Sequence, residues 1–401
     1  MNRLIRVVAG ISCLLLLTVG VFAQENLDDK WKQHMEMAML ALREQRANDA
    51  VLSFQAAAAE AEKFGAQDPR LAQTLFLLGQ YYYSQNRLGE AGMLIRRSLS
   101  ITEFNRGTND PEVAHILDTL ANMYINESSG GDAEPLLKRA LSVREAAFGP
   151  DHQEVDASVN RLAAFYDSQR RYDEVEPLLQ RSLAMREKAV GPDHPLVAVA
   201  INNLGVLYHK QGKLAEAEPL IKRGWTLREK SFGLQHLEVD NSLSSLAALY
   251  RDQERYAESE RLLMLSMSIR DNILGKKNPM DPMLAAGLRE LAVVRMAQGK
   301  YVESQPLLER SLLIEEKFVG TTHPHLAPTL INLARVHLNQ KHYDQAEQLL
   351  NRTLRIQENS LGRENSGLAP TLNTLAEVFR QTGRTAEADS ANARAQALRG
   401  N

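Results

Sequence analysis

Cysteine, glycine and proline are all scarce in this chain of 401 residues, which contains one cysteine, 23 glycines and 14 prolines. The small glycine and proline content excludes collagen-like and low-complexity sequences, and a hydrophobic fraction of 44% excludes a chain too polar to bury a core. An excess of one charge is lacking as well, since 47 lysines and arginines stand against 50 aspartates and glutamates. A surface that binds nucleic acid by releasing counterions is therefore not expected.

The one long apolar stretch, residues 7–22, lies near the N-terminus behind two arginines. A positive start, a short apolar run and small residues before Gln24 are the pattern of a signal peptide over residues 1–23, cleaved after Ala23. An uncleaved membrane anchor is the alternative, although the run is short for a span. Cleavage would remove the only cysteine, so the mature chain would have neither disulfides nor cysteine-ligated metal. The pattern predicts an exported protein that is stabilised by packing.

Glycine recurs at a fixed spacing along the rest of the chain, with steps of 42 residues and one step of 45. The repeating glycines are Gly65, Gly107, Gly149, Gly191, Gly233, Gly275, Gly320 and Gly362. Shortly after each of them comes Asp, His or Asn, in most units followed by Pro. Asp and Asn are good N-caps and Pro is favoured at the first helical position, so each unit is predicted to begin with a helix start.

Apolar residues follow each predicted start at helical spacing. In the fourth unit they are Ile201, Leu204 and Tyr208, with the small residue Gly205 among them, and this spacing places all four on one helix face. A turn at residues 211–213 then precedes a second apolar-periodic segment. Each unit is therefore predicted to be a helical hairpin that buries its apolar face only by stacking on its neighbours.

The repeating motifs resemble those of a known family. Leu-Ala/Gly-x-x-Tyr, G-P-D-H-P and E-A-E-P-L-x-x-R-A-L are similar to the tetratricopeptide repeats of kinesin light chains and their bacterial relatives, from Gly65 to the C-terminus. The resemblance implies an all-α fold, a right-handed α-solenoid of stacked antiparallel helical hairpins (a TPR superhelix), with about eight units over residues 65–401. A degenerate N-terminal hairpin is expected over residues 24–64. Asn392 replaces an aliphatic residue in the last unit, which therefore reads as a C-terminal cap.

Motifs for common enzyme chemistry are missing from the sequence. It has no phosphate-binding loop, no H-E-x-x-H, no G-x-S-x-G, no G-x-G-x-x-G and no EF-hand loop. Four histidines, His152, His194, His236 and His323, share one column with Asp and Asn, which favours helix capping over metal binding. No catalytic residue, cofactor or metal is therefore predicted.

Proteins of this family line a concave groove with their first helices, so the resemblance implies a peptide-binding groove on the non-core face of those helices. The residues assigned to it are Phe76, Tyr83, Asp118, Asn160, Asn202, Asn203, Arg251, Arg289, Asn332, Arg335, Asn373 and Arg380. Asparagine offers a donor and an acceptor to a peptide main chain, and arginine can bind carboxylates with two N–H groups. The alternatives are that the asparagines are only solvated and that the arginines pair with nearby acids such as Glu377 or with water.

Together these features predict a non-enzymatic, exported protein that binds an extended segment of a partner protein in its groove. The ligand is expected to be a protein or peptide, with acidic groups beside the arginines. The alternative is a structural scaffold or assembly factor of an envelope complex that uses its convex surface or its edges. The signal peptide implies a bacterial protein that is periplasmic or secreted and that would meet the membrane only through an uncleaved signal segment. The sequence leaves the oligomeric state open.

Overall fold

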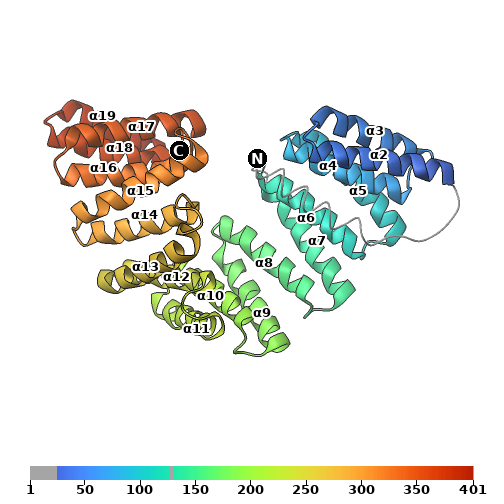
Figure 1. Cartoon of the computed structure of the whole chain (residues 1–401), viewed down its shortest axis with the longest axis horizontal. Coiled ribbons are helices and arrows are strands. Elements are labelled where there is room, and N and C mark those ends of the chain that lie inside the picture. Colours follow the sequence, from blue (N-terminus) through green and yellow to red (C-terminus); the bar gives the residue numbers. More distant parts are fainter. Residues whose placement is uncertain (1–24, 127–129, 401) are drawn as a thin grey trace. The chain divides into compact units, whose positions relative to one another are not determined.

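A computed structural model describes residues 25–126 and 130–400, and every regular element within these ranges is a helix (Figure 1). The predicted signal peptide and its cleavage site between Ala23 and Gln24 lie outside the described residues. The chain divides into two compact units, one up to residue 189 and one from residue 190, and each is described by itself. Among the described helices, none has both the length and the apolar composition that crossing a bilayer requires.

The first unit consists of consecutive helices that pair as hairpins, as the glycine spacing predicts. Its helices are α2 (Glu25–Arg43), α3 (Ala47–Glu62), α4 (Pro69–Ser84), α5 (Leu88–Arg106), α6 (Pro111–Asn126), α7 (Gly130–Phe148), α8 (Gln153–Ser168) and α9 (Tyr172–Val190). The helix that opens each hairpin is called the first helix below, and the helix that closes it the second.

The second unit continues the same pattern with ten helices, two of which are preceded by a short 3₁₀ turn. They are α10 (Pro195–Lys210), α11 (Leu214–Phe232), α12 (Leu237–Asp252), α13 (Tyr256–Arg270), α14 (Pro282–Ala297), α15 (Tyr301–Val319), α16 (Ala327–Asn339), α17 (Tyr343–Leu361), α18 (Ala369–Gln381) and α19 (Thr385–Gly400). The all-α repeat fold predicted from the sequence is confirmed.

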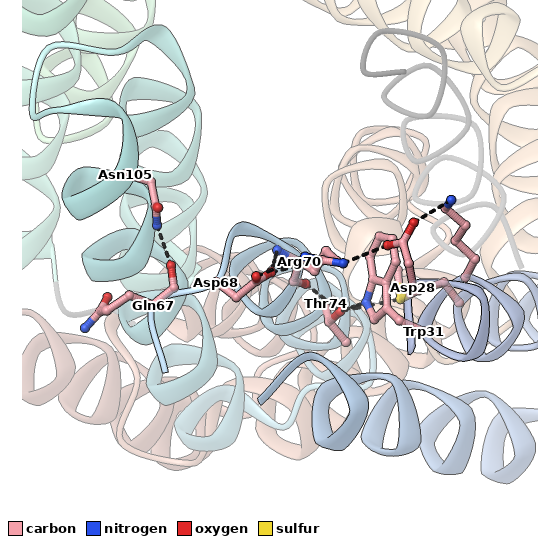
Figure 2. Close-up of polar contacts among 9 residues, drawn as sticks. Asp28, Trp31, Gln67, Asp68, Arg70, Thr74 and Asn105 are labelled. Atoms are coloured by element: carbon pink, nitrogen blue, oxygen red, sulfur yellow. Dashed lines mark hydrogen bonds and ion pairs between the residues drawn. The ribbon is translucent and has the colours of Figure 1, made fainter. Parts of the chain in front are cut away.

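The hairpin α2/α3 corresponds to the degenerate N-terminal hairpin expected before Gly65, and polar contacts attach it to the first complete repeat (Figure 2). The Trp31 indole N–H donates to the Thr74 hydroxyl at 2.9 Å, and Arg70 donates to the Asp28 carboxylate at 2.8 Å. Both bonds join α2 to α4. This hairpin is therefore an additional packed repeat of the solenoid.

The histidine column caps helices. In His152, His194, His236 and His323 the ring Nδ1 accepts the backbone N–H two residues later, at 3.1–3.2 Å. A capping acceptor satisfies an amide that the first helical turn leaves unpaired. The capping interpretation is confirmed, and no group of three or more potential metal ligands occurs among the described residues.

The small residue in each first helix lets the second helix approach closely. A Cβ added at Gly205 would lie 2.7 Å from Ile221 Cγ1, and one at Gly79 would lie 2.5 Å from Ile95 Cγ1. In the hairpin α12/α13 the corresponding pair is Ala247 and Leu263. The β-branched isoleucine therefore occurs opposite glycine, and leucine, which is branched at Cγ and not at Cβ, occurs opposite alanine.

This pairing predicts a coupled pair of substitutions. Gly205→Ala is expected to lower the free energy of unfolding by about 1–2 kcal/mol, since the overpacking outweighs the better helix propensity of alanine. Adding Ile221→Leu is expected to restore the wild-type value. Leu263→Ile, which places isoleucine opposite Ala247, is the matched control and is expected to reproduce the loss. Urea unfolding of the three variants gives these values, and a double variant that remains as unstable as Gly205→Ala would contradict the pairing.

A partly buried carboxylate joins two neighbouring repeats. Glu218 on α11 accepts hydrogen bonds from Lys222 at 2.6 Å, from Arg255 at 3.0 Å and from the Tyr250 hydroxyl at 3.2 Å. Hydrogen bonds from Lys222 first, and then from Arg255 and Gln253, lower the pKa of Glu218 from 4.5 to about 2. The ion-paired form of this carboxylate therefore stabilises the contact between α11 and the following hairpin.

The lowered pKa predicts acid sensitivity. Because the folded pKa of Glu218 lies below the unfolded one, its contribution is fully present above about pH 4.5 and is lost as the pH falls towards 2. Glu218→Gln is expected to reduce the free energy of unfolding by about 1–3 kcal/mol at pH 7. The difference between wild type and variant should shrink to nearly zero at about pH 2, and a difference independent of pH would contradict this role.

Candidate protein-binding surface

A stripe of exposed side chains runs along the first helix α10. Leu196 is 54% exposed, Asn203 and Lys210 are exposed, and Val199 and Val206 are half-buried. These residues recur every three or four positions, so they lie on one helix face, opposite the buried face of Ile201 and its neighbours. This face of α10 is turned to solvent while the other faces pack into the repeat.

At these or directly neighbouring positions, side chains are also exposed or half-buried on the other first helices of the second unit, where α10 contacts α12, α14 contacts α16, and α16 contacts α18. Together with the α10 stripe they are called the first-helix surface below. The further members are Asn241, Ser245, Ala248 and Arg251 on α12, Ala286, Glu290, Val293 and Met296 on α14, Pro328, Asn332, Arg335 and Asn339 on α16, and Pro370, Asn373, Glu377 and Arg380 on α18.

Four of the residues predicted from the sequence are open to a ligand on this surface. Asn203 and Arg335 are exposed, and Asn332 and Asn373 are half-buried. Within the described part of the chain, none of these four side chains forms a hydrogen bond or an ion pair. Their amides and guanidinium are thus available to an external partner.

The other three arginines of the predicted row have acidic partners within the chain. Arg251 contacts Asp252 at 2.8 Å, Arg380 lies 3.6 Å from Glu377, and Arg289 forms an ion pair with Glu315, whose side chain is 4% exposed. The alternative of internal pairing thus holds for these three. Glu315, on α15, is directed at Arg289 on α14, and the guanidinium of Arg289 neutralises this buried carboxylate.

Most of the groove residues predicted in the first unit instead take part in its internal packing. Phe76 is 5% exposed with its ring centroid 5.3 Å from that of His115, and Asp118 is 5% exposed between Arg144, at 2.7 Å, and Arg161. The structure corrects the expectation that these two side chains line an open groove. Phe76 packs in the core, and Asp118 is the counterion of the buried Arg144 and of the partly exposed Arg161 on the neighbouring helix.

Two further predicted residues of the first unit already form hydrogen bonds within the chain. The Tyr83 hydroxyl donates to the backbone carbonyl of Asn122 at 3.5 Å and accepts from the Asn126 amide, so it joins two first helices. The Asn160 amide donates to the carboxylate of Asp156 at 2.9 Å and to Ser182 at 2.9 Å. Asn202, in the second unit, is 8% exposed, and its amide donates only to Ser245, at 3.5 Å.

Buried arginines on the second helices were missed by the sequence reasoning. Arg144, Arg228 and Arg270 are 7%, 4% and 6% exposed, and each reaches the next first helix of its own unit. Their spacing follows the 42-residue repeat, which was the available signal. The column was overlooked because charged residues are expected on a helix surface rather than between helices.

Comparisons with known proteins were made for sequence and for structure. A family model described as tetratricopeptide repeat matches residues 112–188, 154–230, 283–359 and 329–400, which together exceed half of the chain. A second model of the same description matches residues 241–279. No curated protein sequence matches the chain.

Two solved structures show the same fold, and a third is similar to part of the chain. The apo form of the quorum sensor NprR from B. thuringiensis has a TM-score of 0.60 at 14% identity, covering 93% of this chain and 99% of its own. Aspartyl phosphate phosphatase F from Bacillus subtilis has a TM-score of 0.58 at 9% identity, with coverage of 95% and 96%. A putative kinesin light chain from Podosopora anserina with nearly identical TPR-like repeats is 25% identical over 51% of this chain and 95% of its own, at a TM-score of 0.45.

Proposed function

Because the chain belongs to the tetratricopeptide repeat family, we propose that it is a non-enzymatic binding protein that holds an extended segment of a partner protein on its first-helix surface. Repeat proteins of this kind use extended surfaces for protein–protein interaction. The observation that carries the proposal is the presence of Asn203 on α10, Asn332 and Arg335 on α16, and Asn373 on α18, all without partners in the described chain.

The chemistry of this surface suits an extended polypeptide. An asparagine amide donates and accepts at once, so amides spaced along the surface can pair with peptide N–H and C=O groups that would otherwise lose their water. Leu196, Val206 and Met296 add apolar area that a bound side chain would cover. Arg335 adds a cation that favours a segment with an acidic residue at that point.

Export completes the proposal, and it is supported by the sequence of residues 1–23. A protein exported by a bacterium would act in the periplasm or outside the cell. The intact mass of the exported form tests this point, with an N-terminus at Gln24 as the expected result. A species that retains Met1 would show a membrane anchor instead.

Affinity capture tests the binding surface. The mature wild type is expected to retain one partner from envelope extract, identified by mass spectrometry, and the variant N203A/R335A/N373A is expected to lose most of it. All three side chains are exposed or half-buried, so helicity measured by circular dichroism should stay unchanged. Equal capture by wild type and variant would contradict the proposed surface.

A second candidate function, a scaffold that uses the outer second helices, is favoured by apolar side chains on α15. Val302, Leu313 and Phe318 are 76%, 53% and 61% exposed. Exposed apolar side chains are where a partner would gain most by covering them. The variant V302S/L313S/F318S is therefore the matched comparison, because the scaffold function predicts that this variant loses the partner and that the first-helix variant keeps it.

A further inference from the structure

A four-residue polar cluster recurs between the two helices of a hairpin. In α8/α9, the Asp156 carboxylate accepts hydrogen bonds from Arg186 Nε at 2.9 Å, from the Asn160 amide at 2.9 Å and from the Ser182 hydroxyl. Asp156 and Asn160 belong to the first helix, and Ser182 and Arg186 to the second. The carboxylate thus lies between an arginine and an amide and is satisfied by both.

The hairpin α12/α13 carries the same cluster. Asp240, which is fully buried, accepts from Arg270 Nε at 2.8 Å and from the Ser266 hydroxyl. Ser244 replaces the asparagine and accepts from Arg270 Nη2 at 2.9 Å. Again the carboxylate neutralises a buried guanidinium, as a buried cation requires.

The hairpin α10/α11 has the arginine and the asparagine but lacks the carboxylate. Ala198 stands at the aspartate position and Gly224 at the serine position, while Asn202 and Arg228 are retained. A Cβ added at Gly224 would lie 3.3 Å from the Ala198 carbonyl oxygen and 3.6 Å from Asn202 Cβ, so these residues are adjacent as in the complete clusters.

Two buried polar atoms of this hairpin have no hydrogen-bond partner among the described residues, namely Arg228 Nε and Asn202 Oδ1. Arg228 is 4% exposed and Asn202 is 8% exposed. Arg228 Nη1 donates to Ser242, and the nearest carboxylate oxygen, on the partly exposed Glu238, is 3.6 Å from Nε and outside hydrogen-bond distance. Burial lowers the pKa of Arg228, which shows that the surroundings do not fully compensate its charge.

We propose that α10/α11 forms a carboxylate-binding subsite in which an acidic group of the bound partner takes the place that Asp156 and Asp240 occupy in the complete clusters. Arg228 Nε would donate to one carboxylate oxygen. The Asn202 amide, turned over, would donate Nδ2 to the other oxygen, as Asn160 does to Asp156. Asn202 is followed on α10 by the exposed Asn203 of the first-helix surface.

This inference rests on the proposed function and specifies the ligand group that the surface selects. A carboxylate is favoured over a neutral group because Arg228 is the residue that lacks a full counterion, and because hydrogen bonds from a guanidinium to a carboxylate are the stronger class.

Sodium acetate is the first probe, compared with sodium chloride at the same ionic strength of about 0.1 M. Acetate is expected to raise the melting temperature of the wild type by about 2 °C or more, because a ligand that binds only the folded state stabilises it. The variant Ala198→Asp provides the missing carboxylate internally, so it should melt higher than wild type in chloride and lose the response to acetate. Ala215→Asp, an exposed position on α11, adds the same charge elsewhere and should keep the wild-type response.

Arg228→Gln keeps the experiment decisive if Ala198→Asp does not fold. The chain itself uses glutamine at this column, where the Gln357 side chain accepts a hydrogen bond from Thr371 at 2.7 Å, so the variant should fold. It is expected to lose the acetate response. No acetate effect on the wild type, or an unchanged effect in a folded Ala198→Asp or Arg228→Gln variant, would overturn the subsite.

Capped pentapeptides distinguish a partner carboxylate from a free one. A peptide of alanines with a central glutamate should bind the wild type at least about tenfold more tightly than the glutamine version, and Ala198→Asp should abolish the difference. An uncapped pentaalanine tests a chain terminus as the source. An acetate response without discrimination among peptides would overturn the assignment to a partner and leave a site for free small carboxylates. If N203A/R335A/N373A loses the partner while Ala198→Asp retains it at wild-type affinity, the subsite is wrong and the proposed function stands.

Discussion

Replacing Arg289 with alanine is expected to lower the free energy of unfolding by about 3–5 kcal/mol, whereas Arg335→Ala should change it by less than about 0.5 kcal/mol. Both substitutions remove one guanidinium from a first helix at positions predicted to line the same groove. Arg289, however, neutralises Glu315, which is 4% exposed, while Arg335 is exposed and unpaired within the described chain. The two variants therefore separate an arginine that stabilises the fold from one that is available to a ligand.

Urea unfolding of the two single variants is the measurement, with Glu315→Gln combined with Arg289→Ala as the control. The double variant is expected to recover a large part of the lost stability, because no unpaired charge then remains buried. Similar stabilities of Arg289→Ala and Arg335→Ala would contradict the structural role assigned to the Arg289–Glu315 pair.

Asp240→Ala is expected to cost about 3–5 kcal/mol as well, because it leaves Arg270 buried without its carboxylate. Arg270 is 6% exposed and also donates to the backbone carbonyl of Met283 at 3.1 Å, so it links three helices, α12, α13 and α14. Asp389→Ala, at an exposed position of α19, removes the same charge and is expected to change the free energy of unfolding by less than about 0.5 kcal/mol.

The same variant also bears on the incomplete cluster of α10/α11. Asp240→Ala makes α12/α13 resemble α10/α11, so acetate should now stabilise the variant more than it stabilises the wild type. Adding Arg270→Gln should restore part of the stability and remove the extra acetate effect. A stability of Asp240→Ala equal to that of Asp389→Ala would show that the cluster contributes little.

Periodicity and capping residues were sufficient to predict the fold. The apolar spacing of Ile201, Leu204 and Tyr208 is a local property of one helix, and the cap at His194 involves a backbone amide only two residues away. Such short-range interactions can be predicted from the sequence alone, and their repetition every 42 residues predicts the stacking. The three extra residues of the one longer step lie in the connection between Gly275 and α14, which follows a π-helical turn at Asp271–Gly275.

Prediction of the site was less complete, because partners of a polar side chain lie on other helices. Arg289 meets Glu315, which is 26 residues away, and Asp118 meets Arg161, which is 43 residues away. Helical spacing places a residue on a face, but it does not show whether a neighbouring helix directs a counterion at it. The incomplete cluster could have been noticed in the sequence as alanine and glycine at Ala198 and Gly224, yet its meaning required the hydrogen bonds of Asp156 and Asp240.

Site-specific photo-crosslinking tests the central claim most directly, because it reports which face of the solenoid contacts the partner. A photoreactive phenylalanine derivative placed at Asn203, on the first-helix surface, should capture the partner from envelope extract, and the same group at Val302, which is 76% exposed on the second helix α15, should not. Capture from Val302 and not from Asn203 would contradict binding on the first-helix surface and support the scaffold function.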